Sequence, residues 1–139
     1  MTLQNQIEVK TLVKAPLNMV WNCWTDPKHI VKWNHASEDW HTTKAESNLV
    51  DGGIFSYRME AKDGSFGFDF EGVFTHVVTE KLIAINLGDN RKMQVQFEPQ
   101  DQFTLVKELF EPEKENPIAM QKTGWLAILD NFKTYVESL

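Results

Sequence analysis

A long C-terminal helix with a single apolar face is the feature that most constrains what this chain can fold into. Asn116 is a favourable N-cap, and Pro117 suits the first helical position because the N–H group that proline lacks has no partner there. Apolar side chains then recur at spacings of three, four and seven residues, at Ile118, Trp125, Ile128, Leu129, Phe132, Tyr135, Val136 and Leu139. This stripe has the 3.6-residue period of a helix, and charged residues occupy the opposite face. We therefore expect the helix to lie on a broad apolar surface.

Three short elements are predicted near the start of the chain. From Gln6 to Val13 apolar and polar residues alternate, which indicates a strand. From Leu17 to Trp24 the apolar residues have helical spacing. Asp26-Pro27 then predicts the start of a second short helix that ends near Trp33. The two helices would form an elbow between strands.

Alternating segments separated by turn sequences fill the middle of the chain. Asp51-Gly52-Gly53 and Asp63-Gly64 are typical turns. The predicted strands comprise one from Trp40, one with Phe55, Tyr57 and Met59 on one face, and the segments Phe66–Val78, Leu82–Leu87, Arg91–Glu98 and Gln102–Phe110. Short connections favour sequential antiparallel pairing. The predicted fold class is α+β, in which a curved antiparallel sheet grips the C-terminal helix and encloses a cavity.

The composition limits the classes of partner. A length of 139 residues predicts a single domain over residues 1–139, and 42% hydrophobic and 12% aromatic residues supply an ample core. The net charge is −6 and no basic cluster exceeds Arg91-Lys92, which argues against nucleic acid and against a membrane surface. No apolar run approaches the roughly 20 residues that span a bilayer. The lone Cys23 excludes an internal disulfide, and we expect a soluble cytoplasmic protein.

Four segments resemble a known protein family. They are Lys14-Ala15-Pro16 with Trp24-Thr25-Asp26-Pro27, then Asp51 through Met59 followed by Asp63-Gly64, then Phe70-Glu71-Gly72-Val73-Phe74, and finally Gly124 through Phe132 with Tyr135-Val136-Glu137. In order and spacing they resemble the Hsp90 ATPase activator homologue (AHSA1-like) family, within the START-like, SRPBCC or polyketide cyclase-like superfamily. The resemblance covers nearly the whole chain. It implies the START-like or Bet v 1-like helix-grip fold in β-α-α-β6-α order, and it carries no set of catalytic residues with it.

Familiar catalytic and metal-binding patterns are missing from the sequence. There is no H-E-x-x-H motif, no G-x-S-x-G elbow and no second cysteine at ligand spacing from Cys23. His35 and His41, which flank Trp40, are weak metal candidates, and solvated or capping histidines are the more common case. The sequence therefore predicts no catalytic residues, no metal and no cofactor.

Aromatic residues on the predicted strands suggest the wall of a cavity. Phe66, Phe68, Phe70, Phe74 and His76 would share one face of a strand if no bulge intervenes. Such rings are usually plain core, but in this fold the concave face is partly core and partly pocket wall, which suits a flat and mostly apolar molecule. The predicted ligand-binding residues are Trp33, Phe55, Tyr57, Phe70, Phe74, Met93, Met120 and Trp125.

Three functions remain open at this point. The first is a non-catalytic protein that binds a hydrophobic or aromatic small molecule. The second is a cyclase or dehydratase that uses the same cavity, with Tyr57, His76 or Asp69 as acid or base. The third, implied by the resemblance, is an interaction module that modulates a chaperone ATPase through an unidentified protein partner.

Two further expectations concern single residues. Arg58 and Glu71 are expected to form an exposed ion pair across neighbouring strands, with little effect on stability. Gly124 lies inside the predicted C-terminal helix, where glycine is unfavourable. Close packing against the sheet is the favoured explanation for it, and room for a ligand beside Trp125 is the alternative.

Overall fold

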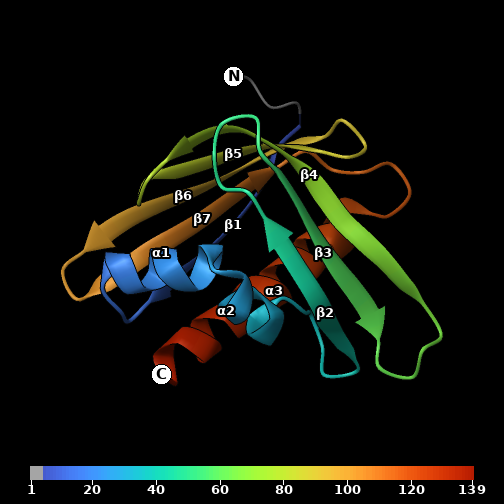
Figure 1. The fold of residues 1–139 in the computed structure, drawn as a ribbon, viewed down its shortest axis with the longest axis horizontal. Coiled ribbons are helices and arrows are strands. Elements are labelled where there is room, and N and C mark those ends of the chain that lie inside the picture. The colour runs from blue at the N-terminus through green and yellow to red at the C-terminus, as the bar shows by residue number, and fades with distance from the viewer. Residues whose placement is uncertain (1–4) are drawn as a thin grey trace.

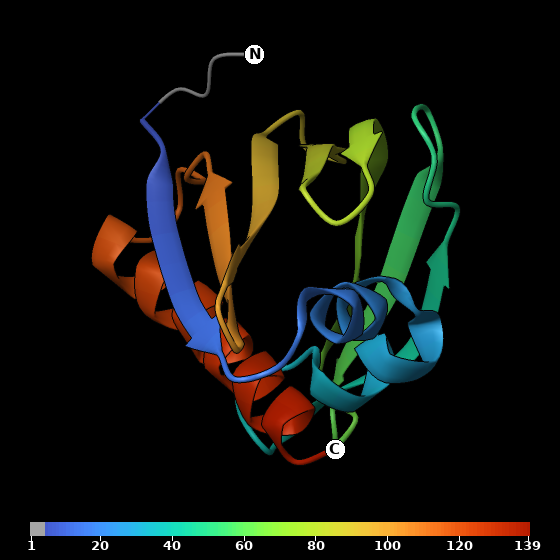
Figure 2. The same cartoon turned by 90° about the vertical axis from the view of Figure 1, so that its left-hand side faces the viewer.

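A strongly curved antiparallel sheet wraps around one long helix in the computed structural model, which describes residues 5–139 (Figures 1 and 2). The elements are β1 (Ile7–Val13), α1 (Leu17–Thr25), α2 (Pro27–Trp33), β2 (Trp40–Ser47), β3 (Ile54–Ala61), β4 (Gly67–Val78), β5 (Leu82–Leu87), β6 (Lys92–Gln100), β7 (Phe103–Phe110) and α3 (Ile118–Glu137). The seven strands lie in the order β1-β7-β6-β5-β4-β3-β2. This arrangement confirms the predicted helix-grip fold. Within the described residues no helix is both long and apolar enough to cross a bilayer.

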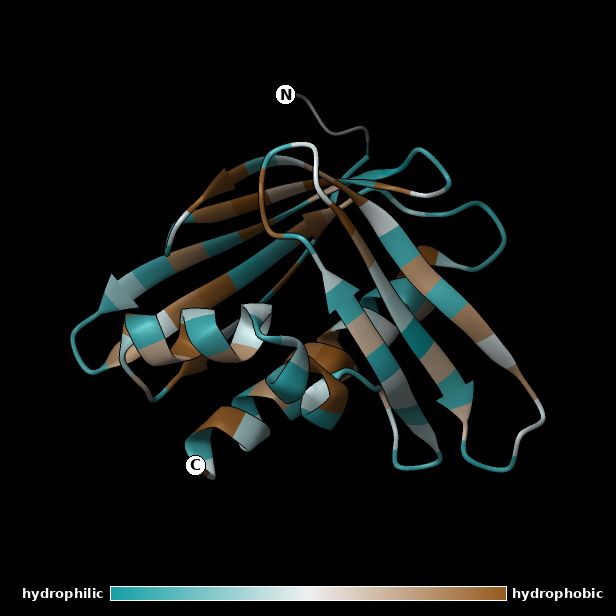
Figure 3. Ribbon diagram, in the orientation of Figure 1, coloured by the Kyte–Doolittle hydropathy of each residue, from teal (hydrophilic) through white to brown (hydrophobic). Residues whose placement is uncertain are grey.

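The alternation of the strands sets which side chains enter the core. Ile7, Val9 and Val13 of β1 are buried, and the outward residues between them are more exposed. The same rule buries Phe55, Met59 and Ala61 of β3 and Met93, Val95 and Phe97 of β6. Figure 3 shows the resulting bands of hydrophobic and hydrophilic residues along the strands. The concave face of the sheet is therefore apolar across its central strands.

The elbow formed by α1 and α2 depends on a proline and a tryptophan. Asp26 is the N-cap of α2, and its carboxylate accepts a hydrogen bond from the Lys28 N–H at 3.0 Å. Because Pro27 has no N–H group, the Cys23 carbonyl loses its usual partner four residues later. The indole N–H of Trp33 donates to that carbonyl instead, at 2.9 Å. The tryptophan thus completes the hydrogen bonding of the elbow from inside the core.

The start of α3 differs from the prediction by one position. Pro117 is the N-cap and Asn116 lies before it, where its N–H donates to the Glu113 carboxylate at 3.0 Å. Gln121 is buried in the first turn and donates to the carbonyls of Glu113 and Asn116. Gln121 therefore fixes the loop before α3 through these hydrogen bonds. The pattern of apolar residues in the helix does not predict this role.

The middle of the predicted apolar stripe of α3 forms its buried face. Leu129, Phe132 and Val136 are at most 1% exposed. Ile118 and Leu139, at the two ends of the stripe, are 55% and 61% exposed. They lie beyond the region where the helix contacts the sheet and the elbow, so the prediction is wrong for these two positions.

Gly124 has open space around it, which contradicts close packing as the reason for this glycine. A Cβ atom at position 124 would meet nothing within 4 Å.

We therefore expect Gly124→Ala to stabilise the protein by about 1 kcal/mol, the usual difference in helix propensity. The free energy of unfolding, measured by urea titration, checks this. Gly72→Ala is the matched contrast and should destabilise, because its Cβ would lie 2.7 Å from the Asn86 carbonyl oxygen. Destabilisation by Gly124→Ala would contradict the prediction.

A bulge in β4 changes the expected arrangement of its side chains. The register between β4 and β5 shifts between Phe74 and His76. As a result His76 turns outward, where its Nδ1 lies 3.5 Å from the Asp51 carboxylate. Phe66 precedes the strand and is 61% exposed. The expected common face thus holds only for the central part of the strand.

The register of β3 and β4 also corrects the predicted ion pair. Arg58 lies opposite Asp69, and Glu71 lies opposite Ser56. The Arg58 guanidinium accordingly contacts Glu60 at 2.9 Å and Asp69 at 3.5 Å. All of these groups are substantially exposed, so the pairs contribute little to stability.

Candidate ligand-binding cavity

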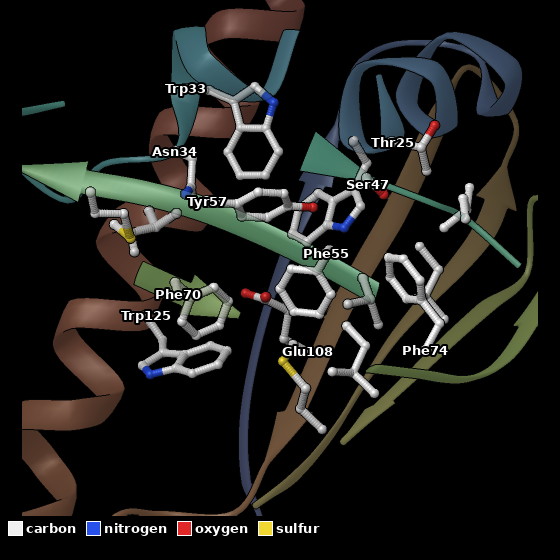
Figure 4. A pocket seen from close by; sticks show the side chains of 18 of the residues that line it. Thr25, Trp33, Asn34, Ser47, Phe55, Tyr57, Phe70, Phe74, Glu108 and Trp125 are labelled. Atoms are coloured by element: carbon white, nitrogen blue, oxygen red, sulfur yellow. The ribbon is translucent and has the colours of Figure 1, made fainter. Parts of the chain in front are cut away.

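A cavity of about 280 Å³ lies between the concave face of the sheet, the elbow and α3. Its volume is close to the lower end of the range for small-molecule sites, about 300 to 1,000 Å³. Figure 4 shows side chains from α2, β3, β4, β7 and α3 that point into it. The sequence-predicted residues that line it are Trp33, Phe55, Tyr57, Phe70, Phe74, Met93 and Trp125. Their contact with a ligand stays a prediction.

Met120 is the one predicted ligand-binding residue that lies away from the cavity. Its side chain is 59% exposed, on the first turn of α3. Trp125 lies five positions further along the helix, and at about 100° per residue the two side chains point roughly 140° apart around the axis. Since Trp125 faces the cavity, Met120 must face away from it.

The aromatic wall is held by contacts between rings. The ring of Phe55 lies 5.1 Å from that of Tyr57 and 5.2 Å from that of Phe74, measured between centroids. Trp125 stacks on Phe110 of β7 at 3.8 Å and meets the edge of Phe70 at 6.2 Å. Ring contacts therefore connect α3 with β4 and β7, and connect β3 with β4, which fixes the shape of the cavity.

Glu108 is a functional candidate that the sequence reasoning missed. It lies on β7 between the buried residues Val106 and Phe110, its side chain is inside the fold at 5% exposure, and it lines the cavity. Within residues 5–139 its carboxyl group has no hydrogen-bond or ion-pair partner. Desolvation raises the pKa of this carboxyl to about 8. At neutral pH most of the empty protein therefore carries Glu108 as the neutral acid.

The other polar groups that line the cavity are mostly occupied. The Thr25 hydroxyl donates to the Trp21 carbonyl at 2.9 Å, and the Asn34 amide donates to the Thr42 hydroxyl at 3.2 Å. Tyr57 is half-buried, and desolvation raises the pKa of its hydroxyl, so it is neutral at physiological pH. The cavity thus combines a large apolar surface with few groups free to orient a ligand.

Two acid–base candidates from the sequence are far from this cavity. His76 and Asp69 are on the convex side of β4, with side chains 57% and 52% exposed. Of the predicted set only Tyr57 faces the cavity. An enzymatic function built on His76 or Asp69 would therefore need a different site.

Metal and thiol chemistry find little support in the described residues. Across residues 5–139 no group of three or more His, Cys, Asp or Glu side chains gathers as a metal site. Desolvation, assisted by Asp26, raises the pKa of the buried Cys23 thiol, which keeps it protonated and inert.

The curved sheet around the long helix defines a helix-grip protein, and comparisons with known proteins identify the family. The family model described as Activator of Hsp90 ATPase homolog 1-like protein matches residues 14–137. The chain belongs to this family, which confirms the resemblance found in the sequence. A search of curated proteins found no match.

Solved structures agree with this assignment. The solution NMR structure of the AHSA1-like protein from Aeromonas hydrophila is 44% identical, with a TM-score of 0.91 over 96% of this chain and 92% of that one. The solution structure of Chr148 from Cytophaga hutchinsonii is also 44% identical, with a TM-score of 0.84 over 97% of this chain and 94% of that one. Protein NE0264 from Nitrosomonas europaea shares the fold at 18% identity, with a TM-score of 0.81 over 96% and 94% of the two chains.

Proposed function

We propose that this protein binds a small, flat and mostly apolar molecule in the cavity beneath the sheet. The observation that carries the proposal is the ring-lined space of about 280 Å³ between α3 and the central strands. At about 30 Å³ for each water in the liquid, this space equals roughly nine waters, enough for a molecule of one or two fused rings. Aromatic walls of this kind are typical of such ligands.

The predicted wall can be tested by placing a charge in it. We expect Phe70→Asp to weaken binding of 2-naphthol by at least tenfold, because the new carboxylate loses its hydration when a ligand fills the cavity. Isothermal titration calorimetry on the folded variant measures this. Phe66→Asp is the matched control, since Phe66 is an exposed phenylalanine just before the same strand. It should leave the affinity within about twofold of the wild-type value.

The outcomes separate the parts of the proposal. Unchanged affinity in a folded Phe70→Asp variant would show that the ligand binds elsewhere. No binding of 2-naphthol, indole or comparable one- and two-ring compounds to the wild type would overturn the binding function itself. The family description would then direct attention to an effect on a chaperone ATPase, measured with purified Hsp90.

Turnover is the second candidate function, and Glu108 is the observation that favours it. A carboxyl group with a pKa near 8 can donate a proton at neutral pH, as a general acid in cyclisation or dehydration requires. Its position in the ring-lined cavity would place it beside a bound substrate. NMR spectra of the compound, recorded over hours in the presence of the protein, distinguish the two functions. A carrier leaves the compound unchanged, whereas an enzyme converts it.

A further inference from the structure

Glu108 is an acidic residue at an inward-facing position of β7, and the inward-facing positions on either side of it hold apolar side chains. Across the ladder it lies opposite Val9 of β1 and opposite Val95 of β6. Both valines are at most 3% exposed. Within residues 5–139, the residues directly opposite on the neighbouring strands therefore offer the carboxyl group no polar partner, and its side chain lines the cavity.

In the part of the chain that the structure describes, no cation that lines the cavity is free to compensate this acid. Among residues 5–139, Arg91 is the only basic residue that lines it. Its guanidinium is already bound, at 2.7 Å to the Asp89 carboxylate and at 3.2 Å to the Glu111 carbonyl. Tyr57, the other titratable group of the lining, is neutral. Among the described residues no cation is left to pair with Glu108, so a bound ligand is the source of charge that the cavity can accept.

The rings near Glu108 suit a cation as well as an apolar body. Figure 4 shows the carboxyl group directed into the space toward which Phe55, Phe70 and Trp125 also point. The faces of aromatic rings attract ammonium groups, and the attraction is strongest where water is excluded. A buried carboxylate among aromatic rings is thus a complementary site for a protonated amine.

We propose that the cavity binds small aromatic amines as ammonium ions, with the N–H groups donating to the Glu108 carboxylate and the ring system lying among Phe55, Phe70 and Trp125. This inference rests on the proposed binding function and specifies its ligand class. Above about pH 8, where Glu108 is ionised, a ligand with a carboxylate would be repelled. A purely apolar ligand would leave this group without a partner.

The proposal has a defined pH dependence. In the empty cavity Glu108 is protonated below about pH 8, whereas the ammonium complex requires the carboxylate, so binding releases one proton. The affinity for an amine should therefore rise about tenfold between pH 6 and pH 7 and level off above pH 8. Tyr57, which also lines the cavity, stays neutral over this range.

The test compares tryptamine with 3-ethylindole, which has nearly the same shape and no amine. At pH 8 we expect wild-type protein to bind tryptamine at least tenfold more tightly, by isothermal titration calorimetry. In Glu108→Gln this preference and the pH dependence should disappear, and 3-ethylindole should bind as before. Proton release on tryptamine binding to the wild type, from titrations in buffers of different ionisation enthalpy, gives a readout that needs no variant.

Each outcome decides a different point. If the wild type binds both compounds equally and releases no proton, the ammonium site is wrong while the apolar cavity stands. If Glu108→Gln keeps the preference for tryptamine, the ammonium lies elsewhere. If neither compound binds to the wild type, the proposed binding function fails as well.

Discussion

The wild-type protein is expected to lose several kcal/mol of stability as the pH rises from 5 to 8, and Glu108→Gln is expected to lose most of this dependence. The pKa of the Glu108 carboxyl is about 8 in the folded protein, whereas the ordinary pKa of a glutamate is 4.5. Between these values the folded state holds a proton that the unfolded state has released. The free energy of unfolding therefore falls by about 1.4 kcal/mol per pH unit in this range.

The sign of this effect is the reverse of that for a carboxylate in a salt bridge. A carboxyl group with a lowered pKa stabilises the fold above its unfolded pKa, whereas Glu108 stabilises it only while protonated. The contribution is complete below about pH 4.5 and is lost as the pH passes through 8. Glutamine keeps the size of the side chain and cannot ionise, so the variant should overtake the wild type in stability near pH 8.

Urea unfolding at pH 5, 6, 7 and 8, at constant ionic strength, measures this dependence. Glu98→Gln is the control, because Glu98 is exposed on the neighbouring strand β6 and its loss should leave the pH profile unchanged. Parallel pH profiles for the wild type and Glu108→Gln would show that Glu108 already has a partner or water that stabilises its charge. That result would also remove the physical reason for an ammonium ligand.

The burial of Glu108 could not be predicted from the sequence. The segment around it carries Val106 and Phe110 on one face and Leu105 and Leu109 on the other. A period of two therefore marks the strand without indicating which face is buried. Only the pairing with β1 and β6 places Glu108 inside, and this pairing joins residues far apart in the chain.

The residues that line the cavity were easier to predict because local signals agreed. Phe55 and Met93 belong to strands with a period of two, and Trp125 lies on the apolar stripe of α3. Met120 is apolar and belongs to the same helix, yet it lies away from the cavity. Its angle around the axis, rather than its hydrophobicity, decides where it points.

The outward turn of His76 and the pairing of Arg58 with Asp69 have a common cause. Each depends on the register between strands, which a bulge or a shift of two positions changes without any change in composition. A single sequence fixes the alternation within a strand. It leaves open which residue lies opposite which, and the residues on either side of a bulge are the first to be misplaced.

Replacing Trp33 should destabilise the protein in two separable steps. Trp33→Phe keeps a ring in the core but removes the indole N–H, so the Cys23 carbonyl is left without a donor at a cost of about 1 to 3 kcal/mol. Trp33→Ala also removes the contacts with Trp24 and Phe132, whose ring centroids both lie 4.8 Å away. Its total cost should be about 3 to 5 kcal/mol.

The free energy of unfolding in urea measures both steps, and a second tryptophan supplies the control. Trp40 is half-buried on the surface of the sheet, and its ring centroid lies 6.0 Å from those of Phe66 and Phe68. Trp40→Ala should therefore lower the free energy of unfolding clearly less than Trp33→Ala. Equal stability of Trp33→Phe and the wild type would show that the carbonyl finds another donor. In that case the end of α1 before Pro27 would not depend on the indole that α2 supplies.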